Sequence, residues 1–197
     1  SGLSDLCGAT GAETVTFRVT DGYGNYAETT ATFTVVDTTD PPAVAQNVTV
    51  TLDANGNGST TAAAVNSGSS DVCGSVTLAL SKTSFTCADL GSNSVTLTVT
   101  DDCGNDATAT ATVTVQDTTN PTITAPADAT FNTDNASCAT LASGVSLGSA
   151  TAADNCTYTV TNDAPASFPL GNTTVTWTVT DSSNNTATDT QIVTVVD

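Results

Sequence analysis

Asp and Asn residues recur in the loops of this 197-residue chain, and together they could bind a metal ion. Carboxylate and amide oxygens are hard ligands that suit Ca²⁺, which takes about six to eight of them. The chain has 20 acidic residues against two basic ones, so a convergent group of carboxylates would need its countercharge from outside. The candidate ligands are Asp37, Asp40, Asp71, Asp101, Asp102, Asn105, Asp117, Asn120, Asp154 and Asp181.

The same residues also have a purely structural interpretation. Asp and Asn begin turns because their side chains bond to nearby backbone amides. A net charge of −18 also keeps an exported protein soluble. The chain has no DxDxDG calcium loop. Both roles, calcium ligand and turn former, therefore remain open for these residues, and a chelator titration distinguishes the two.

Six cysteines form the second group of reactive side chains. They lie at Cys7, Cys73, Cys87, Cys103, Cys138 and Cys156. None forms a CxxC pair and the chain has no His, which argues against zinc and favours disulfides in an oxidising compartment. A nucleophilic thiol at Cys103 would also need a base such as His, so we expect no enzyme.

The charge balance excludes further classes of function. The only basic residues are Arg18 and Lys82, so no basic patch exists for nucleic acid or for an anionic membrane. No apolar run approaches the roughly 18 residues of a membrane helix, so we expect no membrane insertion.

An internal repeat of 80 residues organises the chain. The segments "VTFRVTDGYGN" from Val15, "VTLTVTDDCGN" from Val95 and "VTWTVTDSSNN" from Val175 share one pattern at that spacing. Other residues keep the same period: Gly11, Gly91 and Gly171; Asp21, Asp101 and Asp181; Asn25, Asn105 and Asn185; Asp37, Asp117 and Asp197. The chain is therefore predicted to be a tandem array.

Two linkers containing Pro divide this array. "DTTDPP" and "DTTNP" stop strand pairing because Pro lacks an N–H donor. The predicted domains are residues 1–40, the C-terminal part of an incomplete repeat, and the complete repeats 41–120 and 121–197. We expect the natural chain to be longer than this segment.

Alternating apolar residues predict an all-β fold. Val15, Phe17 and Val19 point one way, with Thr or Arg between them, and the later repeats do the same. In the second repeat we expect strands near 46–52, 59–66, 75–81, 94–100 and 106–116. Residues 60–68 are the only doubtful stretch, and we assign Val65 there to a strand. Short strands with frequent turns predict immunoglobulin-like β-sandwich domains arranged end to end, with a small barrel as the alternative.

The segment "FPLGNTTVTWTVTDSSNNTATDTQIVTVVD" resembles the hyalin repeat (HYR) family of immunoglobulin-like modules. The second repeat is similar to the repeats of giant secreted adhesins of gliding Bacteroidota, the SprB type. This resemblance covers the whole chain and implies a secreted or bacterial cell-surface protein, adhesive or stalk-like, without catalysis.

The resemblance also guides the cysteine pairing. Related repeats often carry an extra bridge whose places here hold Ala45 and Ala109, which favours Cys73–Cys87 and leaves Cys73–Cys103 as the rival. Cys138 and Cys156 are the only cysteines of the third repeat, so they are expected to pair with each other or with another chain. Cys7 and Cys103 are expected to find no partner within this segment.

The expected function is that of a stalk segment in a long surface adhesin or filament, whose partners are neighbouring repeats of the same chain. Calcium bound between domains would stiffen it. The alternatives are a module that itself binds a surface glycan or protein, which would need an exposed aromatic or apolar patch, and a self-assembling filament or sheath subunit, which would pair its edge strands.

Overall fold

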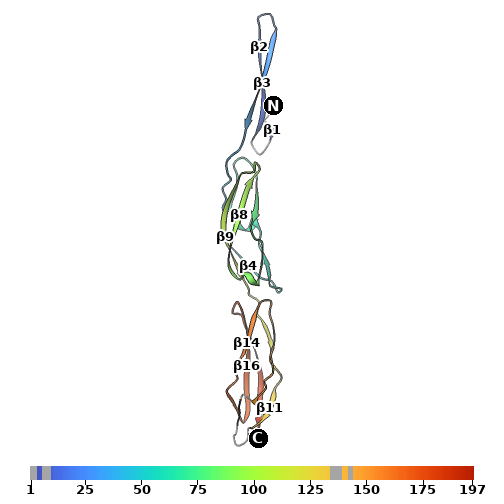
Figure 1. Ribbon diagram of the computed structural model, residues 1–197, viewed down its shortest axis with the longest axis vertical. Helices are drawn as coiled ribbons and strands as arrows, with labels where there is room; N and C mark the ends of the chain where they lie inside the picture. The colour runs from blue at the N-terminus through green and yellow to red at the C-terminus, as the bar shows by residue number, and fades with distance from the viewer. Residues whose placement is uncertain (1–3, 6–9, 134–138, 142–143) are drawn as a thin grey trace. The chain divides into compact units, whose positions relative to one another are not determined.

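A computed structural model describes residues 4–5, 10–133, 139–141 and 144–197 of the chain. Strands dominate the described part, as predicted, and the fold is all-β (Figure 1). The strands are β1 Ser4–Asp5, β2 Gly11–Thr20, β3 Tyr26–Val35, β4 Val48–Thr51, β5 Asn57–Ser59, β6 Val76–Leu80, β7 Ser84–Thr86, β8 Gly91–Asp101, β9 Asp106–Gln116, β10 Thr122–Thr124, β11 Ala129–Asn132, β12 Ala139–Leu141, β13 Thr151–Ala153, β14 Tyr158–Asn162, β15 Ser167–Pro169, β16 Gly171–Asp181 and β17 Thr186–Val196.

The chain divides into two compact units. The first comprises Ser1–Thr49, Ser59–Ser84 and Ser92–Thr114; the second comprises Val50–Gly58, Phe85–Gly91 and Val115–Asp197. The second unit therefore contains the third sequence repeat together with short segments of the second repeat. The division into domains 1–40, 41–120 and 121–197 stays a prediction.

The third repeat forms a layered set of sheets. Its main sheet has the order β11-β17-β16-β14, and the pairs β10-β13 and β12-β15 form two smaller sheets. Strand β11 runs parallel to β17, while β16 and β17 form an antiparallel hairpin. The buried cluster consists of Phe168, Val175, Trp177, Val193 and Val195. Trp177 occupies the position in β16 that Leu97 has in β8, and both side chains are buried.

A buried amide fixes Trp177 in this core. Gln191 is 1% exposed, and its Oε1 accepts a 3.2 Å hydrogen bond from Trp177 Nε1. Its Nε2 donates to the carbonyls of Ala127 and Leu147, at 2.8 and 3.0 Å. Because a buried polar group is costly unless it is hydrogen-bonded, this arrangement specifies one packing of the core.

The second repeat shows the same alternation. Its main sheet has the order β4-β9-β8-β6, and β5 pairs with β7. Val95, Leu97 and Val99 are buried along β8, while the Thr residues between them are half-buried. Strands were predicted close to β4, β6, β8 and β9, and these are confirmed.

The strand predicted at 59–66 is wrong over most of its length. Residues Ala62–Val65 form one helical turn, α1, instead. Thr61 caps it by accepting a 3.2 Å hydrogen bond from Ala64 N, and three consecutive Ala residues favour the helix. Val65 is fully buried all the same, so the apolar residue was recognised but not its backbone conformation.

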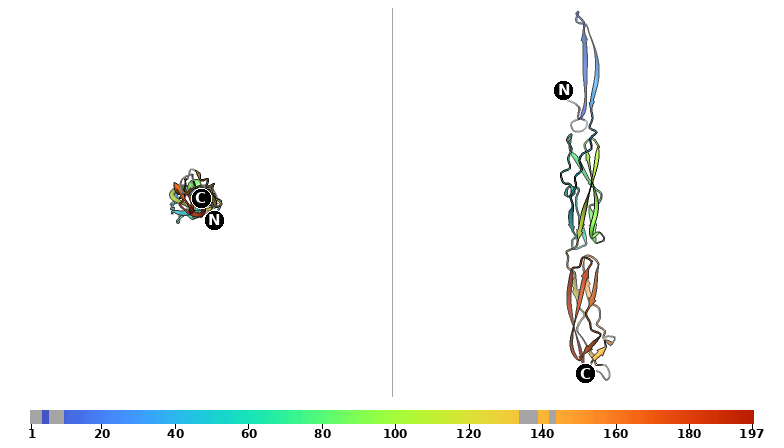
Figure 2. Two further views of the ribbon diagram at one scale, coloured as in Figure 1. Left: turned by 90° about the horizontal axis from the view of Figure 1, so that it is seen from below. Right: turned by 90° about the vertical axis from the view of Figure 1, so that its left-hand side faces the viewer.

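The hairpin β2–β3 carries the same sequence pattern without a cover. Phe17 and Val19 are 52% and 70% exposed, whereas the equivalent Leu97 and Val99 are fully buried. Figure 2 shows the hairpin as two long antiparallel strands. Among the described residues this hairpin pairs only with the short strand β1, so its apolar side chains stay exposed.

No helix among the described residues has the length and apolar character that crossing a bilayer requires.

Candidate metal centre

Two clusters of side chains with metal-ligand chemistry lie among the described residues. In the first unit, Asp37, Asp71 and Cys73 each bring one ligand atom within 4.8 Å of the others. In the second unit, Asp117, Asp154 and Asp181 do the same. We call these the thiol cluster and the carboxylate cluster.

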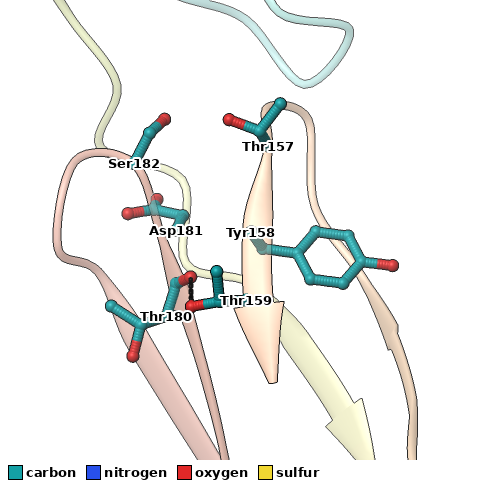
Figure 3. Close-up of a pocket in the computed structure, with 6 residues that line it drawn as sticks. All are labelled: Thr157, Tyr158, Thr159, Thr180, Asp181 and Ser182. Atoms are coloured by element: carbon teal, nitrogen blue, oxygen red, sulfur yellow. Dashed lines mark hydrogen bonds between the residues drawn. The ribbon is translucent and has the colours of Figure 1, made fainter. Parts of the chain in front are cut away.

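Three loops position the carboxylate cluster. Asp117 directly follows β9, Asp154 directly follows β13, and Asp181 is the last residue of β16. Figure 3 shows Asp181 where its strand meets the hairpin turn, beside the chain that enters β14. Asp117 and Asp181 are each 5% exposed, so two of the three carboxylates are withdrawn from water.

Hydrogen bonds occupy only part of this cluster. Asp117 Oδ1 accepts from Thr119 N and Asn155 Nδ2, at 3.0 and 3.1 Å. Asp154 Oδ2 accepts from Cys156 N at 2.8 Å. Three buried oxygens accept nothing: Asp117 Oδ2, Asp154 Oδ1 and Asn155 Oδ1. Such buried acceptors are rare, and a water or an ion is the usual partner. Asp37 Oδ2, in the thiol cluster, is also buried without a partner.

Asp181 is the best satisfied of the three acids. Its Oδ1 accepts from the backbone of Ser183 and Asn185, and its Oδ2 accepts from Asn185 Nδ2, each at 2.8 Å. Asn185 Nδ2 also donates to the Asp117 carbonyl at 3.3 Å, which ties the hairpin turn to the linker. Each Asp181 oxygen therefore faces a defined direction before any ion binds.

The donor set fits a hard cation. It consists of three carboxylates and one amide oxygen, and the sequence of the second unit contains no Lys, Arg or His to neutralise them. Oxygen ligands of this kind suit Ca²⁺ rather than Zn²⁺, which prefers nitrogen and sulfur. Asp117 and Asp154, each with one unoccupied oxygen, and Asp181 would hold the ion, with Asn155 as a further ligand.

Other acidic residues are turn formers, as the structural interpretation predicted. Asp21 Oδ1 accepts from the backbone of Tyr23 and Asn25, and Asn25 Nδ2 donates to Oδ2. These bonds, led by the Asn25 side chain, lower the pKa of Asp21. Backbone bonds from Asn57 and Asn55 lower the pKa of Asp53 in the same way. The turn-forming interpretation therefore holds for Asp21 and Asp53, and calcium binding stays a prediction for the clustered acids.

The remaining predicted ligands are dispersed. Asp101 pairs with Asn105 at 2.8 Å, which is the main reason that the pKa of Asp101 is lowered. Asn105 Nδ2 also donates to the Asp37 carbonyl at 3.3 Å, so these residues do lie near the thiol cluster. Asp102 binds Ser75 instead, accepting from its N and Oγ at 3.0 and 2.9 Å. Asp40 and Asn120 are exposed and do not belong to either cluster.

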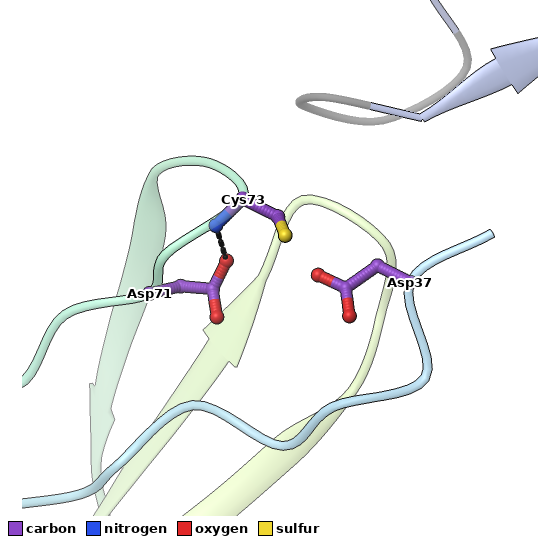
Figure 4. Close-up of side chains that lie close together, drawn as sticks. All are labelled: Asp37, Asp71 and Cys73. Carbon is purple, nitrogen blue, oxygen red and sulfur yellow. Dashed lines mark hydrogen bonds between the residues drawn. The ribbon is translucent and has the colours of Figure 1, made fainter. Parts of the chain in front are cut away.

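The thiol cluster has a cysteine where the carboxylate cluster has a third Asp. Figure 4 shows the Cys73 Sγ facing the Asp37 carboxylate, while Cys73 N donates to Asp71 Oδ2 at 2.7 Å. The thiol's hydrogen bond to Asp37 is the largest cause of a raised Cys73 pKa, followed by burial and by the charges of Asp37, Asp71 and Asp101. The acidic neighbours thus favour the thiol over the thiolate at Cys73, where the carboxylate cluster has a third carboxylate instead.

The predicted disulfides are wrong. Cys87 pairs with Cys156, with an S–S distance of 2.06 Å and a Cα–Cα distance of 5.6 Å, so neither Cys73–Cys87 nor Cys138–Cys156 forms. Cys73 is free, which also removes Cys73–Cys103. Cys103 is disulfide-bonded, contrary to the prediction that it would find no partner in this segment. Cys7 and Cys138 lie outside the described residues.

The pairing error has a physical source. Each repeat was assumed to close its own bridge, but Cys87 belongs to the second sequence repeat and Cys156 to the third. The equivalent loops "DVC" at 71–73 and "DNC" at 154–156 give no signal for this bond, because Cys73 is free. Asn155 was not among the predicted ligands, and only its buried, unpaired oxygen marks it as a candidate.

A hollow beside Asp181 does not suggest an organic ligand. Its volume is about 150 Å³, and Thr157, Tyr158 and Thr180 are among its lining residues (Figure 3). Small-molecule sites are usually concave spaces of roughly 300–1,000 Å³. This hollow is below that range, whereas a second one beside Asp117, with Leu90 and Ser183 among its lining residues, has a volume of about 550 Å³.

No family model and no curated protein matches this chain. Similar solved structures include extracellular cadherin domains 3–6 of protocadherin gamma B2 (14% identity, TM-score 0.42, covering 94% of this chain and 60% of that one). Mouse cadherin-23 EC22–24 matches at 15% identity and TM-score 0.39, covering 95% and 75%. An endo-fucoidan hydrolase of glycoside hydrolase family 107 matches at 15% identity and TM-score 0.30, covering 95% and 34%. Likenesses at this level carry no argument about the function of this chain.

Proposed function

We propose that this chain is a structural segment of an extracellular, repetitive adhesin or filament, in which successive repeats are fixed to one another and a bound Ca²⁺ stiffens their junction. In this proposal the chain extends a longer molecule from a bacterial surface and carries no catalytic role. The resemblance of residues 168–197 to the hyalin repeat agrees with it.

The Cys87–Cys156 bond is the observation that carries this proposal. It joins residues 69 positions apart that come from two successive sequence repeats. A module that acts alone gains nothing from a covalent tie to the next module, whereas an extended array gains resistance to separation. The repeats would thus be joined twice, by the chain and by the disulfide.

The carboxylate cluster supports the calcium part of the proposal. Asp117 comes from the segment that links the second and third repeats, and Asp154 and Asp181 come from the third. An ion bound by all three would hold the linker against the loops that follow β13 and β16. It would also relieve the repulsion among three close carboxylates with no basic residue in that unit.

Two measurements on the 197-residue chain test this proposal. Thermal unfolding with excess Ca²⁺ and with EDTA should differ, since a ligand at 100 times its Kd stabilises the folded state by about 2.7 kcal/mol. Small-angle scattering should report an elongated particle whose flexibility rises in EDTA. An unchanged melting temperature contradicts the calcium part, and a compact particle contradicts the structural role.

A further inference from the structure

The disulfide and the carboxylate cluster share one short segment, Asp154–Asn155–Cys156. Resting on the function proposed above, we propose that the Cys87–Cys156 bond and the bound cation are thermodynamically linked: the intact disulfide tightens Ca²⁺ binding, and Ca²⁺ in turn protects the disulfide from reduction. The junction would then be stiff only under oxidising, calcium-containing conditions.

The linkage begins at Cys156. Its sulfur is bonded to Cys87, and its backbone N donates to Asp154 Oδ2 at 2.8 Å. That hydrogen bond orients the carboxylate and leaves Oδ1 buried without a partner. The disulfide thus fixes the residue that in turn fixes a candidate ligand.

Cys87 is held firmly enough to transmit this constraint. It begins the 3₁₀ turn η1, Cys87–Asp89, which follows β7 directly. A capping box closes the turn: Thr86 N donates to Asp89 Oδ2 at 2.9 Å, and the Thr86 side chain accepts from Ala88 N at 3.4 Å. Reciprocal capping of this kind satisfies two otherwise free donors, so Cys87 is anchored on its own side of the bond.

Asn155 is fixed from both sides. Its Nδ2 donates to the Asp53 carbonyl and to Asp117 Oδ1, at 3.0 and 3.1 Å. Its own carbonyl oxygen lies 3.3 Å from Cys87 Sγ. These contacts leave Asn155 Oδ1 buried and unpaired beside the carboxylates, as a ligand would be.

Gly56 permits this close packing. A Cβ at residue 56 would lie 2.6 Å from Cys87 Sγ and 2.8 Å from the Asn155 carbonyl oxygen, and the φ of Gly56 is +74°. The turn, the disulfide and the ligand-bearing segment therefore contact one another without spare volume. A side chain at Gly56 would displace them without removing a sulfur or a ligand.

Reduction would release this arrangement. The disulfide accepts two electrons and two protons from a dithiol such as dithiothreitol, the S–S bond breaks into two thiols, and the dithiol becomes a cyclic disulfide. The disulfide would then no longer hold residues 154–156, and the Asp154 carboxylate could move away from Asp117 and Asp181. Because coupling between two sites is reciprocal, the factor by which the disulfide tightens Ca²⁺ is also the factor by which Ca²⁺ stabilises the disulfide.

Calcium titration by calorimetry tests the first half of the linkage. We expect Cys87→Ser/Cys156→Ser to bind Ca²⁺ roughly 10- to 100-fold more weakly than the oxidised wild-type chain, as outer-shell changes at metal sites typically do. Cys73→Ser, at the equivalent position of the thiol cluster, should leave the affinity unchanged. Far-ultraviolet circular dichroism verifies that each variant keeps its strands.

Gly56→Ala keeps both sulfurs and all ligands, so it tests the linkage if the serine variant fails to fold. We expect weaker Ca²⁺ binding, with Gly68→Ala as the matched control: Gly68 also has a positive φ, +96°, but its Cβ would meet nothing within 4 Å. Equal Ca²⁺ affinity for wild type and for both Gly56→Ala and the serine variant overturns the linkage and leaves the calcium site intact.

Reduction of the wild-type chain tests the reciprocal half without any variant. Differential alkylation and peptide mass mapping measure the fraction of Cys87 and Cys156 reduced at set ratios of dithiothreitol to its disulfide. Ca²⁺ should raise the ratio needed for half reduction by the same factor as above. An unchanged ratio in a chain that does bind Ca²⁺ overturns the linkage alone, whereas a chain that binds no Ca²⁺ overturns both this inference and the calcium part of the proposed function.

Discussion

The thiol cluster and the carboxylate cluster are built from equivalent loops, but they differ in the state of the cysteine and in the burial of the residue before it. Each cluster combines an Asp that follows the second strand of a hairpin (β3 or β9) with an Asp two residues before a Cys. Each also lies near an Asp–Asn pair in a hairpin turn. In the carboxylate cluster the Cys is bonded and the residue before it, Asn155, is half-buried. In the thiol cluster Cys73 is free and Val72 is 98% exposed. The same loop pattern therefore ends in two different arrangements, one with a bonded cysteine and one with a free cysteine.

Contacts from outside the loop decide the outcome. The Asp53–Gly56 turn and Cys87 hold Asn155 and Cys156 in place. In the thiol cluster, the Cys73 sulfur instead faces Asp37, whose carboxylate raises the pKa of the thiol. A metal-binding junction would thus require the repeat's own loops together with a turn and a cysteine supplied by the preceding repeat.

Removing the disulfide should have the largest effect on this comparison. The bond spans 69 residues, and closing a loop of that length stabilises the folded state by about 4 kcal/mol on the chain-entropy account. We therefore expect Cys87→Ser/Cys156→Ser to lower the free energy of unfolding by that order in urea titrations without calcium. Cys73→Ser should change it by less than about 0.5 kcal/mol. Similar losses in the two variants would mean that the equivalent cysteines do not differ as the structure indicates.

The next largest difference between the two clusters should come from neutralising one carboxylate in each. Asp117→Asn keeps the shape of the side chain but removes one of three clustered carboxylates, whereas the thiol cluster has two carboxylates and a thiol; each cluster has a buried oxygen without a partner. We expect Ca²⁺ affinity to fall roughly 100-fold or more, because ligand charge tunes calcium binding over several decades. The matched variant Asp37→Asn should leave the titration unchanged. Comparable losses from both changes would show that the thiol cluster binds calcium as well.

The sequence predicted the class of fold and the convergence of several loops. The alternation of Val95, Leu97 and Val99 with Thr is a local pattern, so strand β8 and its burial could be predicted. Asp117, Asp154 and Asp181 were all among the predicted calcium ligands, and the structure brings them together. The helical turn at Ala62–Val65 could not be predicted, because one turn is too short to show a helical period.

The disulfide between repeats could not be predicted from the sequence, for a different reason. Spacing along the chain does not reveal that Cys87 meets Cys156, since Cys73 and Cys103 are closer candidates in sequence. The role of Asn155 depends on which of its atoms stay unpaired after folding, and that depends on Asp53 and Asp117. Such information arises only when separate segments are packed together.

Exchanging the residues that precede the two cysteines, Asn155 and Val72, would test the comparison further. Asn155→Val removes the hydrogen bonds to Asp53 and Asp117 as well as one candidate ligand oxygen, and places the residue found at 72 in the carboxylate cluster. We expect about a 10-fold loss of Ca²⁺ affinity in calorimetry, the lower range for partners that orient a metal ligand. The reverse change, Val72→Asn, should alter neither stability nor binding, because Val72 is 98% exposed. A gain of calcium binding in Val72→Asn would mean that the loop sequence suffices.

The smallest expected effect concerns the reactivity of Cys73. Its pKa is raised above the ordinary value of 9.0, mainly by the interaction with Asp37, so little thiolate exists at pH 8. In Asp37→Asn the pKa should fall toward its ordinary value, which increases the thiolate fraction but makes each thiolate somewhat less nucleophilic. The net expectation is a roughly 3-fold faster reaction of Cys73 with iodoacetamide, since only the thiolate reacts. Asp71→Asn should accelerate alkylation less, because Asp71 acts on the thiol through its charge alone and ranks below Asp37 among the causes. Equal rates in wild type and Asp37→Asn would remove the carboxylate as the reason why this cysteine, unlike Cys156, remains an inert thiol.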